Sequence, residues 1–242
     1  MKSLPFSVYE RLPKRMPYSL GFSRYALDFN GTNAYVNIPD DPSLRLTGNA
    51  TWIFWTFIRS LDVEEDILFK HYNYEFEILF RPDGQVRLNH GDGTYETVIV
   101  APSGSIDLNV WTCWAITRDI SSKLAYCYKN GVLMNPGGSS FTKTPVSSTH
   151  SVLIGRGETA RYLDGLIPLV LMYNRVLSQE EILYIMLNYH NPIRDGLVLW
   201  LPFEEGRGTT VYDKSGNNNN GTIYNATWKK LKMWELRSSV GL

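Results

Sequence analysis

"GLVLWLPFEEGRGTTVYDKSGNNNNGT", residues 196–222, is the stretch that decides how this chain folds. Its apolar opening indicates a strand, and the Gly- and Asn-rich part after it indicates turns. The stretch reads like the start of a β domain, yet it lies near the end of the sequence. It is either a second domain cut short or a segment that returns to a body built by the earlier residues. We favour the second interpretation, because an unpaired apolar strand invites aggregation.

The composition predicts a well-packed protein rich in strands. Of 242 residues, 43% are hydrophobic and 13% aromatic, so the chain can bury a sizeable core. Lys and Arg together number 24, as do Asp and Glu, which gives a net charge of zero. This neutrality argues against a nucleic-acid binder, which needs a basic surface. No stretch approaches the length of a transmembrane helix, so we expect no membrane insertion.

Local patterns predict many short strands and a single helix. "ATWIFWTFI" (50–58) carries apolar residues on both faces, as expected of a central strand that is covered on both sides. "RPDG" (81–84) and Asn130-Gly131 are hairpin turn signals. Ser178 and Glu181 form a capping box, which predicts a helix that ends before Asn191-Pro192. These elements predict an all-β, two-sheet antiparallel sandwich.

Four segments carry a family resemblance in their order and spacing. They are "ALDFNGTNAYVNIPDDPSL" (26–44), "WTCWAITRD" (111–119), "KLAYCYKNGVL" (123–133) and "YLDGLIPLVLMYNRVLSQEEI" (162–182). Together they resemble the laminin-G-like jelly-roll modules of the concanavalin A-like lectin/glucanase superfamily. The resemblance implies a jelly-roll sandwich, in which the stretch at 196–222 looks like a first strand, so the chain is predicted to be circularly permuted. One departure is Pro168-Leu169, where the family usually has an acidic pair.

We expect three parts along the chain: an extended N-terminal arm (1–22), the sandwich (23–228, completed by 196–228) and a basic C-terminal tail (229–242). Both ends are basic, with five basic residues against one acidic residue in 1–24 and four against one in 229–242. The arm is too apolar for a solvated tail and too rich in proline for a helix. It is therefore predicted to lie on protein. Its expected contact residues are Phe6, Tyr9, Arg11, Lys14, Arg15 and Tyr18.

No sequence pattern for catalysis stands out. The chain has no nucleophile elbow, phosphate-binding loop or dinucleotide fingerprint. Glu75 and Glu77 alternate on one strand, as acidic residues do in glucanases of the resembled superfamily, but they are not the full acidic motif. We expect them on a solvated outer face and expect no enzyme. Cys113 and Cys127 could form a disulfide, although two buried thiols are the favoured interpretation.

Two kinds of binding site are considered. The loop with Asp213, Asn217 and Asn219 offers oxygen ligands for a structural calcium ion, which modules of the resembled type often hold. Asp28 and Asp164 are further candidates. The alternative is that such Asn-Gly loops are simply turns. Separately, three tryptophans are candidates for a sugar-stacking platform if they are exposed, the alternative being core packing. They are Trp200, Trp228 and Trp234.

The function expected from the sequence is a non-catalytic structural or recognition module. The N-terminus lacks the apolar segment of a secretory signal. With the basic ends, this favours a component of a virion or phage particle, in capsid decoration or host attachment. Its partners would be other subunits, bound through the arm and tail. The alternative is a carbohydrate-binding module or adhesin of a cell surface, or a glycan-active enzyme.

Overall fold

The computed structural model describes residues 24–159 and 161–231. Extended segments dominate it, because short runs of β-branched and aromatic residues alternate with turn-forming residues. The strands are β1 (Tyr25–Asn30), β2 (Tyr35–Ile38), β3 (Ala50–Ile58), β4 (Glu65–His71), β5 (Phe76–Phe80), β6 (Val86–Gly91), β7 (Tyr95–Ala101), β8 (Trp111–Asp119), β9 (Leu124–Lys129), β10 (Val132–Leu133), β11 (Ser139–Ser140), β12 (Val152–Ile154), β13 (Asp164–Ile167), β14 (Val170–Tyr173), β15 (Leu197–Leu201), β16 (Thr210–Val211), β17 (Gly221–Tyr224) and β18 (Thr227–Lys230). The described helices are α1 (Gln179–Leu187) and the 3-10 turn η2 (Pro42–Leu44).

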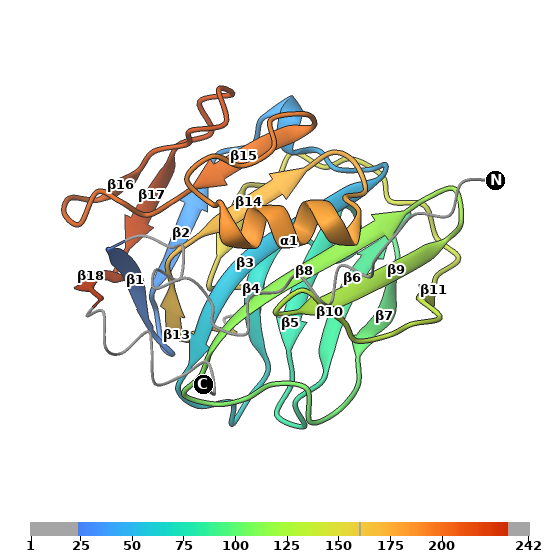
Figure 1. The fold of residues 1–242 in the computed structure, drawn as a ribbon, viewed down its shortest axis with the longest axis horizontal. Helices are drawn as coiled ribbons and strands as arrows, with labels where there is room; N and C mark the ends of the chain where they lie inside the picture. The colour runs from blue at the N-terminus through green and yellow to red at the C-terminus, as the bar shows by residue number, and fades with distance from the viewer. Residues whose placement is uncertain (1–23, 160, 232–242) are drawn as a thin grey trace, which may run out of the picture.

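The strands form two sheets that stack as a sandwich (Figure 1). Sheet A runs in the order β10-β9-β8-β3-β13-β1-β18, and β14 joins β3 to β15. Sheet B runs in the order β16-β17-β2-β12-β4-β5-β6-β7. Every pairing between the named strands is antiparallel. The predicted all-β jelly-roll sandwich with one short helix is confirmed.

The late segment of the chain enters both sheets of this one sandwich. β15 pairs with β14 in sheet A, β17 pairs with β2 in sheet B, and β18 pairs with β1. In Figure 1 the red strands β17 and β18 lie beside the blue strands β2 and β1 of the N-terminal part. β18 extends to Lys230, so the boundary expected at residue 229 falls inside a strand. The circular permutation inferred from the sequence stays a hypothesis.

One apolar core fills the space between the sheets, and we call it the inter-sheet core. Strand β3 shows how it forms: Trp52 and Phe54 point into it from sheet A and meet Phe76 and Phe80 of sheet B. The intervening side chains of β3 point to the opposite side of sheet A. The prediction that 50–58 is covered on both faces is therefore confirmed.

A second apolar core, the helix-side core, lies between sheet A and α1, which crosses the sheet in Figure 1. Ile182 and Ile185 of α1 pack there with Ile53 and Trp55 of β3. The helix begins at the predicted capping box, in which the Ser178 side chain and the backbone N–H of the third helical residue are bonded. Such a cap supports the helix start by about 1 kcal/mol. Sheet A is thus apolar on both faces.

The predicted turns have the backbone conformations that their residue types favour. Gly84, in the predicted hairpin turn, has φ +79°, and Asn130 and Gly131 have φ of 51° and 79°. These left-handed conformations are those that Gly and Asn tolerate best.

Cys113 and Cys127 lie on neighbouring strands but belong to different cores, and both are free. The favoured interpretation of two buried thiols is confirmed, and the disulfide is not formed.

Candidate functional site

The outer face of sheet B carries a connected group of polar and charged side chains on its central strands. Alternation along the strands places them there: Ile78 and Leu88 point into the inter-sheet core, so Glu77 and Asn89 point outward. Glu77 and Asn89 are cross-strand neighbours, with Phe69 on the other side of Glu77. This row crosses three adjacent strands, β4, β5 and β6.

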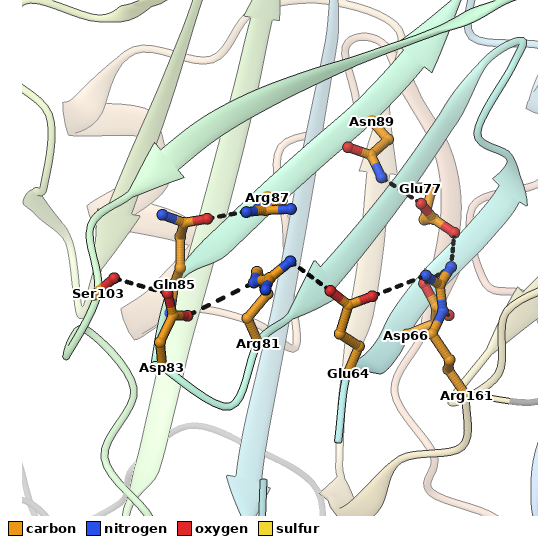
Figure 2. A network of polar contacts seen from close by, with 10 residues as sticks. All are labelled: Glu64, Asp66, Glu77, Arg81, Asp83, Gln85, Arg87, Asn89, Ser103 and Arg161. Atoms are coloured by element: carbon orange, nitrogen blue, oxygen red, sulfur yellow. Dashed lines mark hydrogen bonds and ion pairs between the residues drawn. The ribbon is translucent and has the colours of Figure 1, made fainter. Parts of the chain in front are cut away.

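Arg161 ties the centre of this face together, as Figure 2 shows. Its Nε donates to Asp66 Oδ2 at 2.7 Å, its Nη1 to Glu64 Oε2 at 3.1 Å, and its Nη2 to Glu77 Oε1. The second oxygen of Glu77 accepts a hydrogen bond from Asn89 Nδ2 at 2.5 Å. One guanidinium therefore joins three carboxyl groups. We call these five residues the Arg161 network.

The two central carboxyl groups are taken out of water. Asp66 is 0% exposed and Glu77 is 1% exposed. Gly157 covers Asp66 so closely that an added Cβ would lie 1.9 Å from its Oδ2. Burial, together with the neighbouring charge of Glu77, raises the pKa of Asp66. The expected solvated outer face at Glu75 and Glu77 is therefore wrong: Glu77 is held by Arg161 and Asn89, and Glu75 accepts from Ser148.

The network continues as a polar strip toward the turn between β5 and β6 (Figure 2). Arg81 donates to the other oxygen of Glu64 at 2.5 Å, and Arg87 donates to Gln85 Oε1 at 2.5 Å. Asn89 has a further feature: its Oδ1 is buried and has no hydrogen-bond partner within the described residues. A buried acceptor without a partner is costly, so a donor from outside the chain would be favoured there.

Aromatic side chains lie at one side of this face. Tyr35 of β2 stacks on Tyr224 of β17, with ring centroids 4.7 Å apart and an interplanar angle of 8°. The two residues are cross-strand partners, which explains the close contact. Tyr224 is 43% exposed. Arg156, from the loop after β12, packs against the ring of Tyr35 and against that of Tyr162 in the same loop.

A second aromatic group lies at the end of β4 and around the turn that leads to β5. The His71 ring lies 4.4 Å from that of His150 and 4.6 Å from that of Tyr74. Tyr72 meets Tyr95 edge to face at 5.7 Å. Burial, followed by the proximity of the His150 ring, lowers the pKa of His71. The outer face of sheet B thus carries aromatic rings at two of its borders and polar groups between them.

The loop residues predicted to bind calcium instead organise their own loop. Asp213 Oδ1 accepts from the backbone N–H groups of Trp200 and Ser215, both at 2.9 Å. Its Oδ2 accepts from the Ser215 hydroxyl and from the Asn219 N–H. Asn217 and Asn219 donate their amide groups to backbone carbonyls of β15. Both carboxylate oxygens of Asp213 therefore already accept hydrogen bonds from within the protein.

The other two calcium candidates lie elsewhere, on β1 and β13. Arg59 binds both of them, with its Nη1 2.7 Å from Asp28 and its Nη2 2.8 Å from Asp164. Among the described residues, no group of three or more His, Cys, Asp or Glu side chains is arranged to hold a metal ion. These residues do not fit a calcium site as they stand, and calcium binding stays a prediction.

The three tryptophans do not form a shared platform. Trp200 is 6% exposed and belongs to the helix-side core, where the Arg194 guanidinium lies 4.6 Å from its ring centroid. The expected stacking role is therefore wrong for Trp200. Trp228 is half-buried against the inter-sheet core, and its Nε1 donates to Gly208. Trp234, the residues of the predicted arm and the end of the basic tail lie outside the described residues.

No local pattern in the sequence indicates the Arg161 network. Arg161 is separated by 84 positions from Glu77 and by 95 from Asp66. Glu77 was singled out from the sequence, but its partner became visible only through the sheet pairing. No helix in the part of the chain that the structure describes is long and apolar enough to cross a membrane.

The two antiparallel sheets form a jelly-roll sandwich of the lectin-like fold. A comparison with protein families matches residues 30–183 to the family described as the concanavalin A-like lectin/glucanases superfamily. The chain belongs to this family. No curated protein matches the sequence.

Several solved structures share this fold. A proposed carbohydrate binding protein from Bacteroides ovatus ATCC 8483 aligns with a TM-score of 0.64 and 15% identity over 86% of this chain and 60% of that chain. The binding domain of Paraclostridial Mosquitocidal Protein 1 aligns with a TM-score of 0.50 and 16% identity, over 68% of this chain and 46% of that one. The receptor binding domain of botulinum neurotoxin C/D mosaic serotype aligns with 0.50 and 18%, over 66% and 41%. The present chain therefore spans only part of each, and at these identities the likeness concerns the fold.

Proposed function

We propose that this chain is a non-catalytic glycan-binding module that uses the outer face of sheet B. The observation that carries the proposal is the Arg161 network with its aromatic borders. Sugar rings offer C–H groups that pack on aromatic faces and hydroxyls that pair with amide, carboxyl and guanidinium groups. Both kinds of group lie on this face, whereas the outer face of sheet A is covered by α1.

The carboxyl groups of the network favour binding over hydrolysis. A glycosidase needs one acid and one base or nucleophile on either side of the bond that breaks. Asp66 and Glu77 are instead bound to the same guanidinium and are buried. They have no room for a sugar between them, so their role is to hold Arg161 and Asn89 in place. The similarity to binding domains supports the same proposal.

A glycan array with the purified chain tests the proposal. We expect specific binding that is weakened about three- to tenfold by Tyr224→Ala, which removes an exposed ring from the face. Tyr184→Ala is the matched control, since Tyr184 is equally exposed, at 43%, but lies on α1. Absence of binding to any glycan, or equal loss in both variants, would contradict the proposal. Hydrolysis of a bound glycan would contradict its non-catalytic part.

The role in a virion or phage particle remains a separate proposal about where the module works. It depends on the N-terminal arm and the basic tail, and no contact of the described residues bears on it. Mass spectrometry of purified particles tests it: the chain is expected at a fixed copy number, and its absence would contradict the idea.

A further inference from the structure

One arginine on the outer face of sheet B lies among aromatic rings. Arg156, in the loop after β12, pairs with Tyr162 in an isolated antiparallel bridge. Its guanidinium carbon lies 4.9 Å from the ring centroid of Tyr35 and 5.6 Å from that of Tyr162. Tyr35 in turn stacks on Tyr224. We call these four residues the tyrosine–arginine stack.

The charge of Arg156 has no acidic partner among the described residues, unlike that of Arg161 or Arg81. Arg161 binds Asp66, Glu77 and Glu64, and Arg81 also binds Glu64. For Arg156 the described residues supply only ring contacts, and its buried Nε has no hydrogen-bond partner. Ring contacts use the face of the guanidinium and leave the N–H groups in its plane available. A buried donor without an acceptor favours the binding of one.

We propose that Arg156 binds the carboxylate of an acidic saccharide, with the sugar ring packed against the tyrosines of the stack. This inference rests on the proposed glycan-binding function and names its ligand class. A carboxylate is planar and accepts two parallel N–H bonds from a guanidinium, so it suits this arginine better than a neutral hydroxyl. The exposed ring of Tyr224 supplies apolar surface for the sugar beside that charge.

The arrangement also limits how the ligand lies. Tyr35 and Tyr224 are on adjacent strands of sheet B, and Arg156 lies next to Tyr35 on the side of β12. The carboxylate is therefore placed on the β12 side and the sugar ring on the β17 side. A saccharide held in this way can extend along the sheet toward the Arg161 network, whose residue Arg161 belongs to the same loop as Arg156.

Calorimetric titration of the full chain with paired saccharides tests the inference. The probes are a sialylated oligosaccharide and an oligouronide, each beside its carboxyl-reduced form, and a sulfated neutral oligosaccharide. We expect the acidic forms to bind about tenfold or more tightly than their reduced forms. Arg156→Gln should abolish this preference, so that the acidic and the reduced form of each saccharide bind the variant equally. Arg156→Lys should restore it only in part, because lysine lacks the planar fork.

Arg194→Gln is the matched control, because Arg194 also lies over an aromatic ring, that of Trp200, but on the side of sheet A. It should keep the full preference. Equal binding of acidic and reduced forms, or an unchanged preference in Arg156→Gln, would overturn the inference and leave glycan binding intact. Equal binding of the sulfated probe would overturn the specific role of a carboxylate. Failure of every saccharide to bind would overturn the proposed function, and the inference with it.

Discussion

The outer faces of the two sheets are opposites, although both are formed by the same alternation of strand residues. On sheet A, Ile53, Trp55 and Leu171 are covered by α1 in an apolar core. On sheet B, the corresponding surface carries the Arg161 network and the tyrosine–arginine stack. One helix decides the difference, since it follows β14 and lies across sheet A alone.

The two outer faces differ in what they contribute to stability. Apolar side chains under a helix contribute to folding by leaving water. Buried charges contribute little net stability, because their desolvation offsets their attraction. The polar outer face of sheet B is therefore the face to which we assign the proposed binding.

Replacing Trp200 should have the largest effect on stability. Such a loss would show that Trp200 serves the folding of the helix-side core. Trp200→Ala leaves a large cavity in the helix-side core, so we expect a loss of about 3–5 kcal/mol in the free energy of unfolding. Urea denaturation measures it. A stable variant with impaired glycan binding would instead restore the stacking role expected from the sequence.

Replacing Arg161 tests the polar face. Arg161→Gln leaves the buried Asp66 and Glu77 without their cation, so we expect a loss of about 2–4 kcal/mol, measured by urea denaturation. Adding Asp66→Asn to this variant should recover part of the loss, because it removes one uncompensated charge. If the second substitution adds a further loss instead, the carboxyl groups are held by something other than Arg161.

Glu65, the buried first residue of β4 in sheet B, offers a test by pH. Burial raises its pKa from 4.5 to about 8, with the N–H of Asp164 as a weaker opposing contact. The folded state therefore binds a proton more tightly than the unfolded state. Its stability contribution is full below about pH 4.5 and is lost as the pH rises toward 8.

We expect Glu65→Gln to remove this loss. The variant should gain on the order of 2 kcal/mol relative to the natural chain between pH 5 and pH 8. Thermal unfolding at the two pH values, at equal ionic strength, measures the difference. Arg59, Asp62 and Asp164 also act on Glu65, and their charges are the same in both proteins. Parallel pH profiles of the two proteins would show that Glu65 does not titrate in this range.

Asp213 should give the smallest effect, and it links the sheets. Its carboxylate joins β15 of sheet A to the loop before β17 of sheet B. Asp213→Asn should cost about 1–2 kcal/mol, because charged acceptors form stronger hydrogen bonds. The cost should be equal with calcium and with a chelator if the carboxylate serves the loop alone. A larger cost in calcium would support the ion predicted from the sequence.

Local signals in the sequence were sufficient for most of the fold. The capping box of α1, the turn at Gly84 and the double burial of β3 each depend on neighbouring residues, and each was predicted correctly. The resemblance supplied the jelly roll itself. Side-chain alternation predicted that Glu75 and Glu77 share a face, but it could not tell that loops and Arg161 would cover that face.

The site was harder to predict because its contacts join distant parts of the chain. Arg156 and Arg161 have no pattern around them, and their partners Tyr35 and Asp66 are brought near only by the pairing of β12 with β2 and β4. Trp200 failed as a candidate for a related reason. Its exposure depended on α1 and the helix-side core, not on its neighbours in sequence.

The pairing of β1 with β18 has a consequence for biosynthesis. Because β1 finds this neighbour only in residues 227–230, the growing polypeptide cannot close sheet A until that last strand has emerged from the ribosome. Until then the nascent chain holds β1 with one edge unpaired, and proteins with such long-range pairings fold slowly. Pairing along this edge of β1 therefore has to wait for residues 227–230, about 200 positions further along the chain.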